Sequence, residues 1–303
     1  MNSLNVNYPA VYVVSGEDAS IAVIRLSTNE VTATIPLMGT SSDMIMWPHH
    51  ISSHEGHLAI GVPGMDFSEG QTGAMEGMTG KLLVVDAMNG TIAENVDLPA
   101  MNHNTIYAPN GAEIWVPQMD VDGKVNATTY ALTNTITVGM MPAELTFSAN
   151  GSKAYVANGD DDTVSIINVG SKTVVATVNV GDNPVGAWTG SDGRMYVDNE
   201  DVQSISVINV TTNAIDQTID LGFMPGIASY YGTKSELWVS DPMAGKVHYW
   251  TWDAAMMMWM DGGVFNTAAG AHAITFTADG ATAYVTNQMA NAVSVVNVSN
   301  HGY

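Results

Sequence analysis

Four of the eight histidines of this chain stand at matching points of a repeated sequence, where their imidazoles could meet. They are His49, His50, His103 and His272. Imidazole nitrogen is a ligand for transition metals, and it serves oxidised as well as reduced copper. The histidines are thus distributed unevenly, since half of them stand at one position of the repeat. This pattern predicts a metal site.

Methionine is concentrated in loops expected at the same end of the repeats. Loops are normally polar, because an apolar group there stays in water and gains little. Thioether sulfur favours Cu(I), and sulfur with neutral imidazole is a ligand set that suits copper. We therefore expect one copper ion held by His50, His103 and His272, with His49 or a methionine of these loops as an additional ligand; Met65 and Met101 are the candidate sulfur ligands. Twelve of the twenty methionines are expected in these loops: Met44, Met46, Met65, Met75, Met78, Met101, Met119, Met140, Met141, Met224, Met243 and Met289.

An aromatic residue recurs at one point of each repeat and gives the period. Tyr155, Tyr196, Trp238 and Tyr284 mark this point, and Trp115 extends the series backwards, at intervals of 40, 41, 42 and 46 residues. Each repeat contains short segments of alternating apolar and polar residues, separated by turn sequences. This period and content predict an all-β fold, a β-propeller whose blades are four-stranded antiparallel sheets.

Seven blades follow from the number of second and third strands. In the clearest repeat the four strands, named A to D from the centre outwards, are expected over residues 145–148, 154–157, 164–169 and 174–180. An A strand is found only six times, because the first blade begins almost at its B strand and the last ends after its C strand. Residues 3–7 are the candidate for completing the ring, as strand D of blade seven or strand A of blade one.

Propeller geometry explains why the histidines would meet. Loops from strand D to the next strand A lie on the same face as loops from B to C, so each A strand starts at the mouth of the central channel. These positions hold His49 and His50 in blade two, His103 in blade three, Glu144 in blade four and His272 in blade seven.

A single domain is expected over residues 1–303, since propellers of this size form one core. Residues 61–80 are an insertion in blade two that would lie over the channel mouth as a Met-rich loop. The remaining histidines have other expected places. His54 and His57 belong to an A-to-B turn on the opposite face, His248 packs within a C strand, and His301 lies in a fraying tail.

The repeats resemble the YVTN-repeat, or YncE-like, propellers. Residues 284–287 read Tyr-Val-Thr-Asn, and related segments begin at Ala154 and Met195. The resemblance covers nearly the whole chain and implies an extracytoplasmic location, in the periplasm, secreted or at the cell surface. The family contains surface proteins, binding scaffolds and enzyme subunits, so the fold leaves the activity open.

The histidine pattern is distantly similar to the nitrous oxide reductase propeller, where imidazoles from several blades hold copper. By position His49, His50, His103 and His272 would be the corresponding residues. Blades five and six offer no histidine, which implies a single copper rather than a cluster.

Composition narrows the possible partners. Eight basic and thirty acidic residues give a formal charge of -22, which repels nucleic acid and anionic lipid and favours cations or a basic protein. Cysteine is absent, which excludes disulfides, thiolate sites and iron-sulfur clusters. We expect no membrane insertion, because no apolar run approaches the ~20 residues of a span. Residues 1–20 carry no secretion signal pattern.

Two alternatives remain open beside a copper carrier. One is a surface or interaction propeller without metal, whose Met-rich face docks a partner protein. The other is a copper-dependent oxidoreductase, which needs an open coordination position and a substrate. The sequence contains none of the common nucleophile-elbow, phosphate-loop or zinc-protease motifs, so whether the chain is an enzyme stays undecided.

Overall fold

The computed structural model describes residues 4–38, 45–67, 78–120, 122–128 and 132–302. Within them the chain forms a seven-bladed β-propeller, with five four-stranded and two three-stranded antiparallel sheets, and this confirms the predicted fold. The chain divides into two compact units, Met1–Leu145 and Thr146–Tyr303. The expectation of one domain stays a prediction. No helix in the described part of the chain is both long and apolar enough to cross a membrane.

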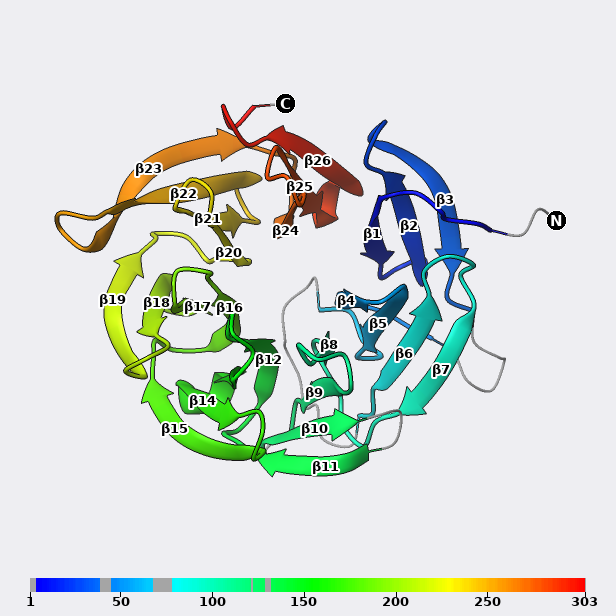
Figure 1. Ribbon diagram of the computed structural model, residues 1–303, viewed down its shortest axis with the longest axis horizontal. Helices are drawn as coiled ribbons and strands as arrows, with labels where there is room; N and C mark the ends of the chain where they lie inside the picture. The colour runs from blue at the N-terminus through cyan, green and yellow to red at the C-terminus, as the bar shows by residue number, and fades with distance from the viewer. Residues whose placement is uncertain (1–3, 39–44, 68–77, 121, 129–131, 303) are drawn as a thin grey trace. The chain divides into compact units, whose positions relative to one another are not determined.

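The first unit contains three blades and the start of a fourth (Figure 1). Blade one is β1 (Ala10–Ser15), β2 (Ser20–Arg25) and β3 (Glu30–Pro36), and blade two is β4 (Ile51–His54), β5 (His57–Val62), β6 (Lys81–Asp86) and β7 (Ile92–Asp97). Blade three is β8 (Ile106–Tyr107), β9 (Ile114–Gln118), β10 (Lys124–Thr128) and β11 (Leu132–Thr137).

The second unit contains the remaining blades. Blade four is β12 (Pro142–Phe147), which spans the boundary, then β13 (Lys153–Asn158), β14 (Thr163–Asn168) and β15 (Thr173–Asn179), with the short 3-10 helix η1 (Gly159–Asp161). Blade five is β16 (Pro184–Thr189), β17 (Arg194–Asn199), β18 (Ser204–Asn209) and β19 (Ala214–Asp220). Blade six is β20 (Ala228–Tyr231), β21 (Glu236–Asp241), β22 (Lys246–Asp253) and β23 (Met258–Asn266), and blade seven is β24 (Ala271–Phe276), β25 (Thr282–Asn287) and β26 (Ala292–Asn297), with the 3-10 helix η2 (Gln288–Ala290).

Burial falls from the middle strands to the outermost strand of a blade. In blade four β13 and β14 are buried on both faces, whereas β15 is largely exposed. A strand covered on both faces reads as continuous Val and Ile, and β14 has the sequence TVSIIN. Neighbouring blades pack through these strands: in the first unit Val23, Ile35, Leu58 and Ile60 share one hydrophobic cluster.

A buried asparagine at the end of the B strand joins strands B and C in several blades. The amide of Asn199 donates to Ser204 Oγ at 3.1 Å and to Ser206 Oγ at 3.0 Å, and Asn158 donates to Ser165 Oγ at 3.0 Å. In the last blade Ser294 Oγ donates to Asn287 Oδ1 at 2.7 Å. A buried amide needs such partners, so this contact accounts for the asparagine that closes the repeated Tyr-Val-Xaa-Asn.

The N-terminal segment differs from both sequence-based alternatives. Among residues 4–7, which the structure describes, no strand forms. Instead the backbone N–H of Val6 donates to the carbonyl of Met88 at 2.8 Å, and the buried Val6 side chain joins the cluster of blades one and two. The segment therefore packs on the turn between β6 and β7, where burial of the Val6 side chain stabilises it.

His301 is also placed differently from the prediction of a fraying tail. Its Nε2 lies 3.0 Å from Glu236 Oε2, and its ring stacks on Tyr249 with centroids 4.2 Å apart. Trp238 Nε1 donates to the same Glu236 oxygen at 2.9 Å. The end of the chain is therefore held in blade six by an aromatic pocket with a buried acceptor.

Candidate metal centre

Three of the predicted histidines come from two loops whose backbones are fixed by blade two. His49 and His50 directly precede β4, where the N–H of His49 donates to the carbonyl of Gly61 at 2.9 Å and the N–H of Gly61 donates to the carbonyl of His50 at 3.0 Å. His103 precedes β8, and β4 contacts β8. Two adjacent A strands thus present their leading residues to one another.

Glycines at both ends of the insertion make room for the segment that carries His103. A Cβ on Gly61 would lie 3.0 Å from both the Asn102 side-chain nitrogen and the carbonyl oxygen of His103. A Cβ on Gly80 would overlap Oδ1 of Asn102. Glycine is required where another backbone approaches this closely, so the insertion begins and ends on residues that seat the His103 loop.

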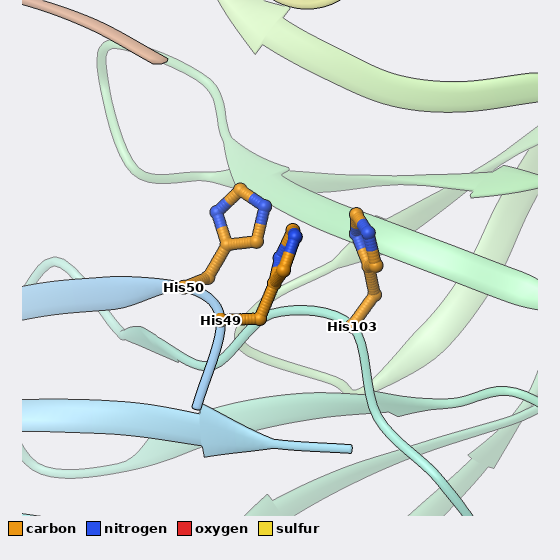
Figure 2. Close-up of side chains that lie close together, drawn as sticks. All are labelled: His49, His50 and His103. Carbon is orange, nitrogen blue, oxygen red and sulfur yellow. The ribbon is translucent and has the colours of Figure 1, made fainter. Parts of the chain in front are cut away.

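The imidazoles of His49, His50 and His103 converge. One ring nitrogen from each lies within 4.8 Å of the others, and Figure 2 shows the three rings projecting side by side from their loops. Ring centroids are 4.7, 4.6 and 5.0 Å apart. Tetrahedral nitrogen ligands at about 2.0 to 2.1 Å from a metal stand about 3.3 Å apart. Small side-chain rotations would therefore bring these nitrogens to bonding distance of one ion.

The carboxylate of Glu144 joins two of the imidazoles. Its Oε1 lies 2.8 Å from Nε2 of His50 and 2.7 Å from Nδ1 of His103, and the side chain is buried. Asn104 holds β12 in place for this contact: its amide donates to the carbonyl of Leu145 at 3.0 Å and accepts the N–H of Leu145 at 3.2 Å. A carboxylate on the second nitrogen of a ligating imidazole fixes the ring and strengthens its basicity.

The pKa values of His103 and Glu144 favour the binding of a cation by this group of residues. Burial lowers the pKa of His103, and the neighbouring Glu144 opposes this only in part, so the imidazole is neutral and can ligate near pH 7. Burial alone would raise the pKa of the Glu144 carboxyl. Electrostatic attraction to His50 and His103 and their hydrogen bonds to the carboxylate hold that pKa below its usual range instead, so an anion persists beside the rings.

Phe67 covers the triad from the described part of the insertion. Its ring centroid lies 5.5 Å from that of His49, nearly perpendicular, and 5.0 Å from that of His103. An apolar ring in this place limits the access of water to the nitrogens. The sequence analysis missed Phe67 as a site residue, and the one available signal was an aromatic residue in an otherwise Gly- and Met-rich loop.

The other predicted ligands have different outcomes. His272 is the second residue of β24 in the second unit and lies beside Gly226, and its coordination together with the triad stays a prediction. Met101 is fully buried and Met65 half-buried, and ligation by either sulfur stays a prediction as well. Met44 and Met75 lie outside the described residues. Glu144, which the sequence places at the fourth blade opening, proves to be part of the same group as the triad.

His54, His57 and His248 are placed near their expected positions within the blades. His54 and His57 flank the turn between β4 and β5, and the His54 ring lies 5.5 Å from that of Tyr107. His248 lies in β22 and stacks on Phe223 with centroids 4.3 Å apart.

No family model and no curated protein matches this chain. Solved structures are similar in fold. A chain of hydrazine synthase from Kuenenia stuttgartiensis has a TM-score of 0.76 at 13% identity, over 95% of this chain and 92% of that one. The periplasmic gluconolactonase PpgL of Pseudomonas aeruginosa has a TM-score of 0.71 at 14% identity, over 95% and 91%.

A third similar structure, a chain of a mitotic checkpoint complex, has a TM-score of 0.77 at 12% identity, over 98% of this chain and 87% of that one. Identities this low establish the propeller fold alone. Membership of the YVTN-repeat family therefore stays a prediction, as does the similarity to the nitrous oxide reductase propeller.

Proposed function

We propose that this propeller binds a single copper ion through His49, His50 and His103. The observation that carries the proposal is the convergence of three imidazole nitrogens within 4.8 Å of one another. Glu144 supports it, because a buried carboxylate bonded to two of the rings orients them and offsets part of the charge of a bound cation.

Copper is favoured over other divalent metals by the nature of the ligands. All three are neutral nitrogen donors, to which first-row divalent ions bind with affinity rising to copper. The chain has no cysteine to compete for the metal. A role in carrying or storing copper fits this site best. Phe67 covers the site on one side, and such a cover slows the exchange of a bound ion with water.

An extracytoplasmic location belongs to the same proposal. It is supported by the resemblance to YVTN-repeat propellers and by the fold similarity to a periplasmic gluconolactonase. The strongly acidic composition suits a protein that attracts cations and remains soluble without a partner. Fractionation of the source cells with an antibody against the chain would locate it directly, and recovery with cytoplasmic markers would contradict this part.

Copper stoichiometry in matched variants tests the proposal. The metal-free protein is incubated with Cu(II), desalted and measured by elemental analysis. We expect about one copper per chain, lost in the His50→Ala, His103→Ala double variant. The control is His54→Ala, His57→Ala, which removes two histidines of the same unit from the far end of β4. Equal copper in both double variants, or none in the unaltered protein, would contradict the proposal.

A further inference from the structure

A second group of soft metal ligands lies on the loops of blades six and seven. Met243, between β21 and β22, is 74% exposed, and Met289, in η2, is 64% exposed. Met224, between β19 and β20, is 43% exposed. An exposed apolar side chain gains no hydrophobic stabilisation. The presence of three exposed methionines on loops at the same end of adjoining blades therefore requires another explanation.

Backbone hydrogen bonds bring the loops of Met243 and Met289 together. The N–H of Gly270 donates to the carbonyl of Pro242, which precedes Met243, at 3.1 Å. The carbonyl of the same Gly270 accepts the N–H of Gln288, which precedes Met289, at 2.8 Å. A Cβ on Gly270 would also lie 3.1 Å from Cβ of Met289. One glycine therefore links both methionine loops at its two backbone groups.

His272 and the Met224 loop reach the same junction. A Cβ on Gly226, two residues after Met224, would lie 3.4 Å from Cδ2 of His272 and 3.1 Å from Cγ of Pro242. His272 itself follows Gly270 by two residues. The imidazole and the three methionine loops are thus neighbours within the second unit, because His272 and Pro242 lie beside Gly226, and the Met243 and Met289 loops are hydrogen-bonded to Gly270.

We infer that His272, Met224, Met243 and Met289 form a site for a soft monovalent cation, Cu(I) in the cell and Ag(I) as a laboratory probe. Thioether sulfur and imidazole are neutral donors that Cu(I) prefers, and methionine side chains have the three rotatable bonds needed to close on an ion from exposed loops. All four residues belong to the second unit, and the evidence for this site is independent of the triad in the first unit. In this site His272 would ligate the ion together with methionine sulfurs, without His49, His50 or His103.

Protection of methionine from oxidation tests this inference. Thioether sulfur bound to a metal reacts slowly with peroxide, and sulfoxide formation at each residue can be followed by peptide mass spectrometry. Ag(I) is used because it does not change oxidation state with peroxide. Met256 and Met257, in the turn between β22 and β23, are 61% and 73% exposed and provide matched internal controls in the same blade. We expect Ag(I) to slow oxidation of Met243 and Met289 at least about tenfold and to leave both controls unchanged.

Variants separate this site from the triad. The Met243→Leu, Met289→Leu variant changes only exposed side chains, so it should fold normally and lose most Ag(I) binding, whereas Met256→Leu, Met257→Leu should keep it. His272→Ala should weaken Ag(I) binding about tenfold, as expected for loss of one of four donors. The His49→Ala, His50→Ala, His103→Ala variant should show the same protection as the unaltered protein. Equal oxidation rates at Met243 and Met257 with Ag(I) present, or loss of protection in the triad variant, would overturn the inference.

Discussion

Glu144 Oε1 lies 2.7 Å from Nδ1 of His103, although Glu144 lies in β12 and His103 precedes β8, the A strands of successive blades. His50, from the blade before, reaches the same oxygen at 2.8 Å. One buried carboxylate therefore connects three consecutive blades at their innermost strands. A metal held by the imidazoles would depend on this oxygen for the orientation of two of its three ligands.

Replacing Glu144 by glutamine should weaken copper binding without abolishing it. The amide keeps the shape of the side chain but removes the charge that fixes His50 and His103, and loss of such a partner typically costs 10- to 100-fold in metal affinity. We expect Glu144→Gln to retain about one copper per chain at saturation, with the affinity lowered in this range when measured against a chelator of known strength.

The matched control for Glu144 is Glu236→Gln. Glu236 is also buried beside a histidine, since its Oε2 lies 3.0 Å from Nε2 of His301, but it belongs to blade six. Its replacement should leave the copper affinity unchanged. A similar loss in both variants would show that Glu144 acts on general stability rather than on the ligands.

Phe67 should set the preference of the site for the oxidation state of copper. Its ring packs on His49 and His103 and keeps water from the nitrogens, and Cu(II) gains more than Cu(I) from additional water ligands. Phe67→Ala should therefore raise the affinity for Cu(II) relative to Cu(I) about tenfold, which lowers the midpoint potential by about 59 mV for a one-electron couple. Phe223→Ala removes a phenylalanine that stacks on His248 in the second unit and serves as the control. An unchanged potential in Phe67→Ala would refute the role of this ring.

Acidification should destabilise the metal-free protein in two steps. The pKa of His103 is lowered in the folded state by burial, so the unfolded chain takes up its proton first and stability is lost as the pH falls below about 6.5. The pKa of Glu144 is also lowered, so a second loss begins below about 4.3 as the unfolded carboxyl is protonated. Each group contributes a slope of at most about 1.4 kcal/mol per pH unit.

Urea unfolding at a series of pH values measures these slopes. His103→Asn should flatten the dependence of the unfolding free energy between pH 6.5 and 5, because its side chain does not titrate. His57→Asn alters an exposed histidine of the same unit and should leave the slope unchanged. Equal slopes in the unaltered protein and in His103→Asn would contradict the burial argument.

The blades could be predicted from the sequence because the forces that form them act over short segments. The apolar residues of β14, the buried asparagine that closes β17 and the Asn150-Gly151 turn are each encoded within a single repeat. Gly151 adopts φ 69 and its N–H donates to Ser148, as the turn sequence implies. Once the period was fixed, the opening of each A strand was fixed too, and this placed His50, His103 and Glu144 in comparable positions.

The features that the sequence did not reveal depend on packing between segments far apart in the chain. Phe67, in blade two, contacts His103, which precedes β8 in the next blade, and no local sequence pattern encodes that contact. Val6 binds the β6–β7 turn, and His301 enters the pocket beside Trp238, through burial that is available only after the blades have formed. The convergence of His49, His50 and His103 near the openings of the A strands was therefore predictable, while the contacts made by loops and chain ends were not.

The repeated asparagine of the B strand should contribute more to stability than an exposed asparagine. The Asn199 amide donates to Ser206 and its Oδ1 accepts the N–H of Gly181 at 3.1 Å, all within blade five and its leading loop. Asn199→Ala leaves a buried hydroxyl and a backbone N–H without these partners, which costs about 1 to 3 kcal/mol of unfolding free energy for such a group. Asn179→Ala, on the exposed outer strand β15, should change it by no more than about 0.5 kcal/mol. Equal urea midpoints for the two variants would show that the buried asparagine at the end of the B strand adds nothing to the stability of the blade.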